Sequence, residues 1–173
     1  GTGYSTDLLP GAIRKTASEL GVHPLDLATA ISYETGGTFD PWQRGPTTRY
    51  GQHRGLIQWG EPQRQQYGIT EDMPVGQQMQ SVGQYLRDRG VKDGMGLPEI
   101  YSAINAGTVG RLGAVDMGTT VAQKLASPQM ARHRQIGAQF LGLNPGDYPA
   151  EGAHRFRNHL RFFLDRLGNS LDI

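Results

Sequence analysis

The chain has 173 residues, of which 36% are hydrophobic and 19% charged, and 17 Lys and Arg against 16 Asp and Glu leave a formal net charge of +1. This length suits one compact domain with room for a cleft, and the balanced charge gives no reason to expect a nucleic-acid partner. Cysteine is absent, which excludes disulfides and thiolate metal sites. No stretch approaches the ~20 apolar residues of a membrane span, and the opening residues lack the basic and apolar regions of a signal peptide.

Two helices are predicted at the start of the chain. Apolar residues recur at helical spacing over residues 6–20, and Gly21 is a typical helix stop. A second helix is predicted to begin at Pro24, because proline is favoured at the first helical position, and to end before Gly36. Glu34 therefore lies in the last turn of an apolar helix, where a surface carboxylate has no obvious purpose.

The middle of the chain, residues 38–60, has no sustained period and is rich in glycine and proline. It is predicted to form loops with a short hairpin around "TRYGQHRGLIQW". Helical patterns return after it, and helices are predicted at 62–67, 75–89, 97–106, 119–126, 128–141 and 152–167.

These patterns predict one mostly helical domain over residues 1–143. The stretch "GLNPGDYPAEG" is the best candidate linker, and residues 144–173 are predicted to hold this linker and a C-terminal helix. The apolar stripe of that helix is suited to packing on the same domain or against a partner.

Three short segments stand in a characteristic order: "YETGGTFDP" at 33–41, "GLIQWG" at 55–60 and "YSAINAG" at 101–107. Together they resemble the lysozyme-like lytic transglycosylases with an SLT domain. In that family a catalytic Glu closes a helix before a glycine, a Gly-Leu-Met/Ile-Gln segment follows, and an Ala-Tyr-Asn-Ala-Gly segment lies on a later helix. The chain is most similar to the phage-borne versions carried in virion proteins, and the resemblance covers roughly residues 8–110.

The resemblance implies a mainly α, lysozyme-like (α+β) fold with a small loop and hairpin region between helices. It implies a peptidoglycan lytic transglycosylase that cleaves the β-1,4 bond between N-acetylmuramic acid and N-acetylglucosamine and opens the bacterial cell wall during phage infection. The expected partners are peptidoglycan glycan strands, with other virion or tail proteins as candidates for the C-terminal helix. The expected location is the virion, with action in the periplasm or on the cell wall. Neither a cofactor nor a metal is expected.

Glu34 is the expected catalytic residue. Cleavage of a glycosidic bond needs a proton donor at the leaving oxygen, and a glutamic acid can donate only while it stays protonated. An apolar wall and the negative end of a helix dipole both raise the pKa of a carboxyl group. The resemblance implies that the acetamido group and 6-hydroxyl of the muramyl residue do the rest, so that Glu34 acts first as acid and then as base and yields a 1,6-anhydro sugar.

Five residues are candidates for binding substrate. Gln58 and Asn105 carry planar amides that suit an N-acetyl group, and the resemblance implies that both line the cleft. Tyr101, Ile57 and Trp59 are the further candidates, because aromatic rings can stack on sugars and apolar side chains can form the cleft wall. Structural alternatives remain open: Gln58 can satisfy loop backbone, Asn105 can mark a helix end, and the aromatic rings can fill the core.

One departure from the family pattern concerns a tyrosine in the third motif, which is Ile104 here. The phenol expected near the catalytic carboxyl is therefore missing, and Tyr101, one helical turn earlier, is the candidate replacement. Because of this departure, a second interpretation stays open: an inactive virion structural or wall-binding module that retained the lysozyme shape.

A hydrolytic lysozyme is the other alternative, and it needs a second carboxylate. Asp40 and Glu61 are the only acids near the first two motifs. Asp40 precedes a proline and is equally suited to capping a loop, and Glu61 is equally suited to an exposed helix start.

Overall fold

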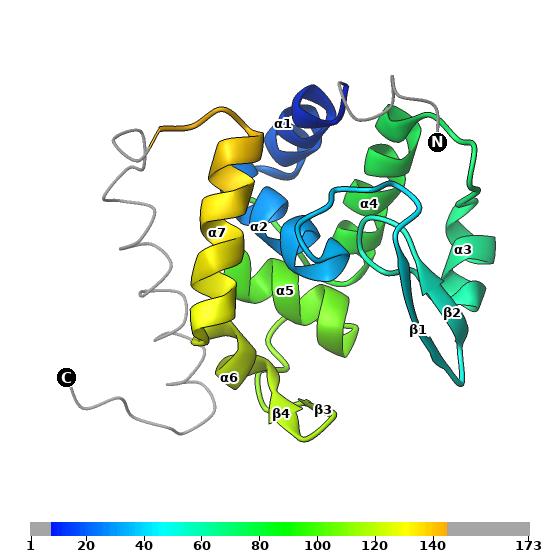
Figure 1. Ribbon diagram of the computed structural model, residues 1–173, viewed down its shortest axis with the longest axis vertical. Coiled ribbons are helices and arrows are strands. Elements are labelled where there is room, and N and C mark those ends of the chain that lie inside the picture. The colour runs from blue at the N-terminus through cyan, green and yellow to red at the C-terminus, as the bar shows by residue number, and fades with distance from the viewer. Residues whose placement is uncertain (1–7, 145–173) are drawn as a thin grey trace.

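The computed structural model describes residues 8–144, in which seven helices and two small two-stranded sheets form a mainly α structure (Figure 1). The predicted linker and C-terminal helix at 145–173 lie outside the described residues. Within 8–144, no helix is both long enough and apolar enough to cross a membrane.

The elements follow the predicted order closely. They are α1 Leu9–Leu20, α2 Pro24–Thr35, β1 Arg44–Thr48, β2 Gly51–Arg54, α3 Glu61–Tyr67, α4 Val75–Asp88, α5 Leu97–Ala106, β3 Val115–Asp116, β4 Thr119–Thr120, α6 Val121–Leu125 and α7 Pro128–Phe140.

The predicted hairpin is present, and its turn joins Thr48 to Gly51, which face each other across β1 and β2. A second hairpin, β3–β4, was not predicted. The helix expected over 119–126 begins two residues later than predicted, because Thr119 and Thr120 pair with β3. Thr120 also caps α6, since its hydroxyl accepts a hydrogen bond from the Gln123 backbone N–H at 3.1 Å.

Helix α2 is the central helix of the described structure. Its N-terminus is capped by the His23 ring, which accepts a hydrogen bond from Leu25 N–H at 3.1 Å, and eight of its twelve residues are buried. α1, α5 and α7 pack against it, and Figure 1 shows α7 running alongside α2. Gly137 permits this close approach, because a Cβ there would lie 3.2 Å from the backbone of Ala28 and Thr29. The helix that carries Glu34 is therefore held on three sides.

Candidate active site

Glu34 lies in the last turn of α2, as predicted, and its side chain is half-buried. Gly36 and Gly37 follow at φ of 63° and 85°, a backbone region that glycine adopts without strain. The Thr35 hydroxyl accepts a hydrogen bond from the Phe39 backbone N–H at 3.1 Å and so fixes the path of the chain after the helix. The chain leaves α2 sharply and adds no side-chain bulk immediately after Glu34.

The Glu34 carboxyl is held in its protonated form at neutral pH. Removal from water raises its pKa from 4.5 to about 8. The Lys124 ammonium acts against this increase and the Asp116 carboxylate adds to it. A raised pKa is the property required of a carboxyl group that donates a proton at neutral pH.

The residue beside Glu34 joins three helices. The Tyr33 ring meets the Tyr101 ring of α5 edge to face, with centroids 5.2 Å apart, and meets the His133 ring of α7 in the same way at 5.4 Å. The Ser32 hydroxyl and His133 Nδ1 lie 2.8 Å apart. Burial and the nearby Arg132 lower the pKa of His133, so its ring is held neutral. The end of α2 is therefore fixed between α5 and α7.

Tyr101 is fully buried, and its hydroxyl makes no hydrogen bond of normal geometry to residues 8–144. Burial raises the pKa of Tyr101 above its usual range, and the nearby Glu34 and Tyr33 raise it further. The phenol thus stays protonated within electrostatic reach of Glu34. Ile104, one turn further along α5, is partly buried and packs against the core.

Three of the predicted substrate contacts are core residues: Tyr101, described above, and Trp59 and Ile57. Trp59 is fully buried and packs edge to face on Tyr85, with ring centroids 5.5 Å apart, so its ring offers no face to a sugar. Ile57 is only 4% exposed. For both residues the structural alternative, burial of a large apolar side chain in the core, accounts for the position of the side chain.

The amide of Gln58 is used within its own loop. Its Nε2 donates to the Gln43 carbonyl at 3.0 Å and to the Gly55 carbonyl at 3.1 Å, and its Oε1 lies against Gly45. The structural alternative for Gln58 therefore accounts for both of its donors. Asn105 is half-buried in the last turn of α5, and its contact with substrate stays a prediction.

Gln78 of α4 is a supporting residue that the sequence analysis missed. Its side chain is buried, its Oε1 accepts from Leu56 N–H at 3.0 Å and Trp59 Nε1–H at 3.3 Å, and its Nε2 donates to the Pro41 carbonyl at 3.0 Å. It thereby joins the second motif to the segment that follows Glu34. Gln78 stands three residues after the apolar Val75, a spacing that places both on the same face of a helix, and this was the available sequence signal for its burial.

The two predicted second acids have local roles. Asp40 is exposed and accepts a hydrogen bond from the Trp42 backbone N–H at 2.9 Å, and Glu61 is an exposed first residue of α3. The acid that raises the pKa of Glu34 is Asp116, which lies on the β3–β4 hairpin that was not predicted. Its Oδ2 accepts a hydrogen bond from Lys124 Nζ at 3.1 Å. A Met-Gly pair, with Asp116 before it and Thr119 after it, was the only sequence signal for that hairpin.

No protein-family model, curated protein or solved structure matches the chain. A function is therefore inferred from the residues and their geometry.

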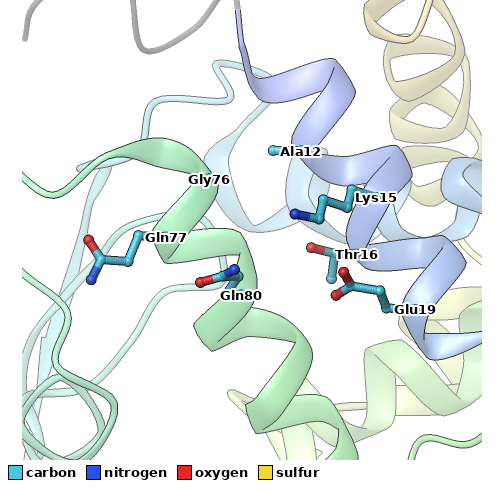
Figure 2. A pocket seen from close by; sticks show the side chains of 7 residues that line it. All are labelled: Ala12, Lys15, Thr16, Glu19, Gly76, Gln77 and Gln80. Carbon is cyan, nitrogen blue, oxygen red and sulfur yellow. The ribbon is translucent and has the colours of Figure 1, made fainter.

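A cavity of about 340 Å³ lies away from these groups, between α1 and α4. Figure 2 shows the residues that line it, Ala12, Lys15, Thr16 and Glu19 on α1 and Gly76, Gln77 and Gln80 on α4. None of them is a predicted site residue. Nor is any group of three or more His, Asp or Glu side chains within 8–144 arranged to hold a metal ion.

The groups near Glu34 suit acid–base chemistry. They comprise one protonated carboxyl, one buried phenol and one ion pair that acts on the carboxyl. A carboxyl group with a pKa close to neutral can both release and recover a proton at moderate cost, which is the requirement for an acid that later acts as a base.

Proposed function

We propose that this chain is a peptidoglycan lytic transglycosylase with a lysozyme-like fold, and that Glu34 is its acid and base. The observation that carries the proposal is the Glu34 carboxyl, half-buried at a helix end with a pKa of about 8. The glycines that follow it leave room for a sugar to approach. The order of the three motifs, which resembles that family, supports the substrate class.

In this mechanism Glu34 gives its proton to the glycosidic oxygen as the bond from that oxygen to the muramyl anomeric carbon breaks. The resulting Glu34 carboxylate then removes the proton of the muramyl 6-hydroxyl while that oxygen bonds to the anomeric carbon. Glu34 ends protonated, and the products are a 1,6-anhydro muramyl end and a free 4-hydroxyl group. No water is consumed.

We assign to Tyr101 the role that the family tyrosine has at the position of Ile104. Its hydroxyl is protonated, within electrostatic reach of Glu34, and makes no hydrogen bond of normal geometry in the described part of the chain. Donation of a hydrogen bond from this phenol stabilises the Glu34 carboxylate formed in the first step. Half-buried Asn105 on the same helix is the remaining candidate for binding the N-acetyl group.

The resemblance to phage-borne enzymes also suggests the biological setting of the chain. We infer that the chain acts as part of a virion, in the periplasm or on the cell wall, where it opens peptidoglycan during infection. Glycan strands are the substrate in this setting.

Hydrolysis is the second candidate function, and the electrostatic effect of Asp116 on Glu34 favours it. A lysozyme requires a second carboxylate that directs water, and Asp116 is the acid that acts on Glu34. Its ion pair with Lys124 argues against free action as a base, because the ammonium stabilises the carboxylate form.

The test is digestion of purified cell walls followed by mass spectrometry of the released muropeptides. Wild-type protein is compared with Glu34→Gln and with Glu19→Gln, an exposed acid on α1 that serves as the matched control. We expect anhydro ends, lighter by one water than reducing ends, from the wild type and from Glu19→Gln. Glu34→Gln is expected to release about a thousand-fold less product, because it can neither give nor take the proton.

Three other outcomes separate the alternatives. Exclusively reducing ends would identify a hydrolase. Equal product from wild type and Glu34→Gln would remove Glu34 from the mechanism. Wall binding without any product from either protein would identify an inactive wall-binding module.

A further inference from the structure

The β1–β2 hairpin and the start of α3 carry an excess of positive charge. Figure 1 shows the hairpin beside α3, and β2 packs on that helix. The whole chain has 17 basic and 16 acidic residues. Residues 41–64, in contrast, hold four arginines and one acid: Arg44, Arg49, Arg54, Arg64 and Glu61. Positive charge is therefore concentrated on one part of the described structure.

Arg44 and Arg54 face each other directly across the two strands. Side chains of directly opposed residues lie on the same face of a sheet, and like charges in this arrangement repel each other. Arg44 is exposed and Arg54 is half-buried. Neither guanidinium makes a hydrogen bond or an ion pair with another residue in the described range 8–144. Folding therefore brings two positive charges together without a compensating anion from this part of the chain.

The ring of Trp42 brings a third arginine to this pair. Trp42 is half-buried, and the Cζ atoms of Arg54 and Arg64 lie 5.7 and 5.8 Å from the centroid of its ring. Arg64 is fixed by its Nη1, which donates to the Gln52 carbonyl at 2.7 Å and to the Trp59 carbonyl at 2.6 Å. A cation–π contact uses none of the N–H donors of a guanidinium. The arginines are thus held in place while donors remain for a ligand.

We propose that Arg44, Arg54 and Arg64, the arginine cluster, bind carboxylates of the peptide stems of peptidoglycan. This inference rests on the proposed function, because it names a second part of the same substrate. The stems are short peptides with free carboxylate groups, and a guanidinium binds a carboxylate through two parallel N–H···O hydrogen bonds. A bound carboxylate also offsets the repulsion between Arg44 and Arg54. In this arrangement the cluster holds the peptide while Glu34 acts on the glycan.

A nucleic acid fits the arginine cluster less well than an acidic peptide does. Proteins that bind a duplex neutralise many phosphates, and they carry a basic stripe and a strongly basic composition. Basic and acidic residues are nearly equal in number in this chain. A few planar guanidinium groups held by an indole ring suit a small number of carboxylates.

The test measures binding to purified cell walls rather than cleavage. The full chain carrying Glu34→Gln, which should leave the walls intact, is the parent protein, and sedimentation with the walls at low salt gives its Kd. Adding Arg44→Gln and Arg54→Gln together should raise the Kd about ten-fold or more, because charge-assisted hydrogen bonds are lost. Lys15→Gln with Lys92→Gln removes as much charge from exposed positions outside the cluster and should leave the Kd unchanged.

Two treatments of the walls identify the anion. Conversion of wall carboxylates to amides with a carbodiimide and ammonia should weaken binding of the parent protein to the level of the double glutamine variant. Removal of wall phosphate with hydrofluoric acid should have no effect. Arg44→Lys with Arg54→Lys keeps both charges but loses the planar guanidinium, so its Kd should lie between those of the parent and the double glutamine variant.

The outcomes separate this inference from the proposed function. Equal binding of untreated walls by the parent and the double glutamine variant overturns the inference, even if the wild type cleaves the walls. A loss of binding after phosphate removal instead of amidation overturns it in favour of a phosphate polymer. Carboxylate-dependent binding through the arginines, without cleavage by the wild type, supports the inference and overturns the enzymatic proposal.

Thermal unfolding checks that the variants fold. Arg44→Gln relieves the repulsion with Arg54, so it should not lower the unfolding temperature. If the double glutamine variant does not fold, Arg44→Gln alone decides the matter, because Arg44 is exposed. We then expect the Kd to rise by about three-fold or more, and an unchanged Kd overturns the inference.

Discussion

The ring of Tyr33 meets the ring of Tyr101 edge to face, with centroids 5.2 Å apart and an interplanar angle of 81°. The immediate neighbour of Glu34 thereby contacts the residue whose buried hydroxyl makes no hydrogen bond of normal geometry within 8–144. Such a hydroxyl reduces stability, because its desolvation is not offset. Its retention beside a protonated carboxyl is explained if it donates to the carboxylate during the reaction.

Replacement of Tyr101 by Phe should separate activity from stability. We expect wall cleavage to fall by about ten- to a hundred-fold, since a charge-assisted hydrogen bond to Glu34 is lost. The free energy of unfolding should stay constant or rise by ~1 kcal/mol, because a buried unpaired polar group is removed. Muropeptide release and urea unfolding measure the two effects.

Tyr85→Phe is the matched stability control for that experiment. The Tyr85 hydroxyl donates to the Ala103 carbonyl at 3.1 Å, so its removal should lower the free energy of unfolding by about 1 kcal/mol. A larger loss of stability in Tyr101→Phe than in Tyr85→Phe would show that the Tyr101 hydroxyl is hydrogen-bonded after all.

Glu34→Gln should change how stability depends on pH. The folded-state pKa of about 8 lies above the unfolded value of 4.5. The stabilising effect of protonated Glu34 is therefore complete below pH 4.5 and is lost as the pH rises to about 8. Between pH 5 and 8.5 the wild type should lose on the order of 2 kcal/mol more than Glu34→Gln, a value reduced for partial exposure of the side chain. Parallel urea-unfolding curves for the two proteins at both pH values would contradict the raised pKa.

The pH profile of wall cleavage should decline on its alkaline side near pH 8. Glu34 is competent as an acid only while protonated, and its pKa is about 8. Initial rates of muropeptide release from pH 5 to 10 measure this limb. A decline that is complete by pH 6 would indicate an ordinary carboxyl group instead.

Gln78→Met should destabilise the fold, because the hydrogen bonds of Gln78 to the GLIQWG segment and to the Pro41 carbonyl are lost. The substitution keeps the size of the side chain but leaves Leu56 N–H, Trp59 Nε1–H and the Pro41 carbonyl without their partner. We expect a loss of roughly 3 kcal/mol in the free energy of unfolding. Gln77→Met, at the exposed neighbouring position, should change it by less than about 0.5 kcal/mol in the same urea titration.

Gly137→Ala should disturb the packing of α7 on α2. The added Cβ would lie 3.2 Å from rigid backbone atoms of Ala28 and Thr29, so we expect a loss of about 1–3 kcal/mol. Gly76→Ala is the control, because nothing lies within 4 Å of its added Cβ and alanine favours a helix. Thermal unfolding should show opposite changes in the two variants, and equal changes would contradict the packing argument.

The helices were predictable because each one carries its own local signals. Pro24 and Gly36 mark both ends of α2, and the apolar spacing of α1 and α4 is regular. The setting of Glu34 followed from the same signals, since a helix end and its glycines are local features. The hairpin turn at Thr48 and Gly51 was also predictable, because glycine is typical of such turns.

Other features depend on contacts between distant residues and could not be predicted. β3 and β4 have two residues each, too few for an alternating pattern. Gln78 is buried because it meets a loop some twenty residues earlier, whereas a glutamine alone predicts an exposed position. Trp59 could be assigned to cleft or core only after the packing of α4 against its loop was known.

The turn between β3 and β4 offers a practical use. Met117 is 96% exposed, and it follows Asp116 directly. Because the chain contains no cysteine, a single thiol introduced at residue 117 would be the sole attachment point for a fluorescent dye. Such a label would report on the surroundings of the hairpin without modification of any group assigned to the chemistry.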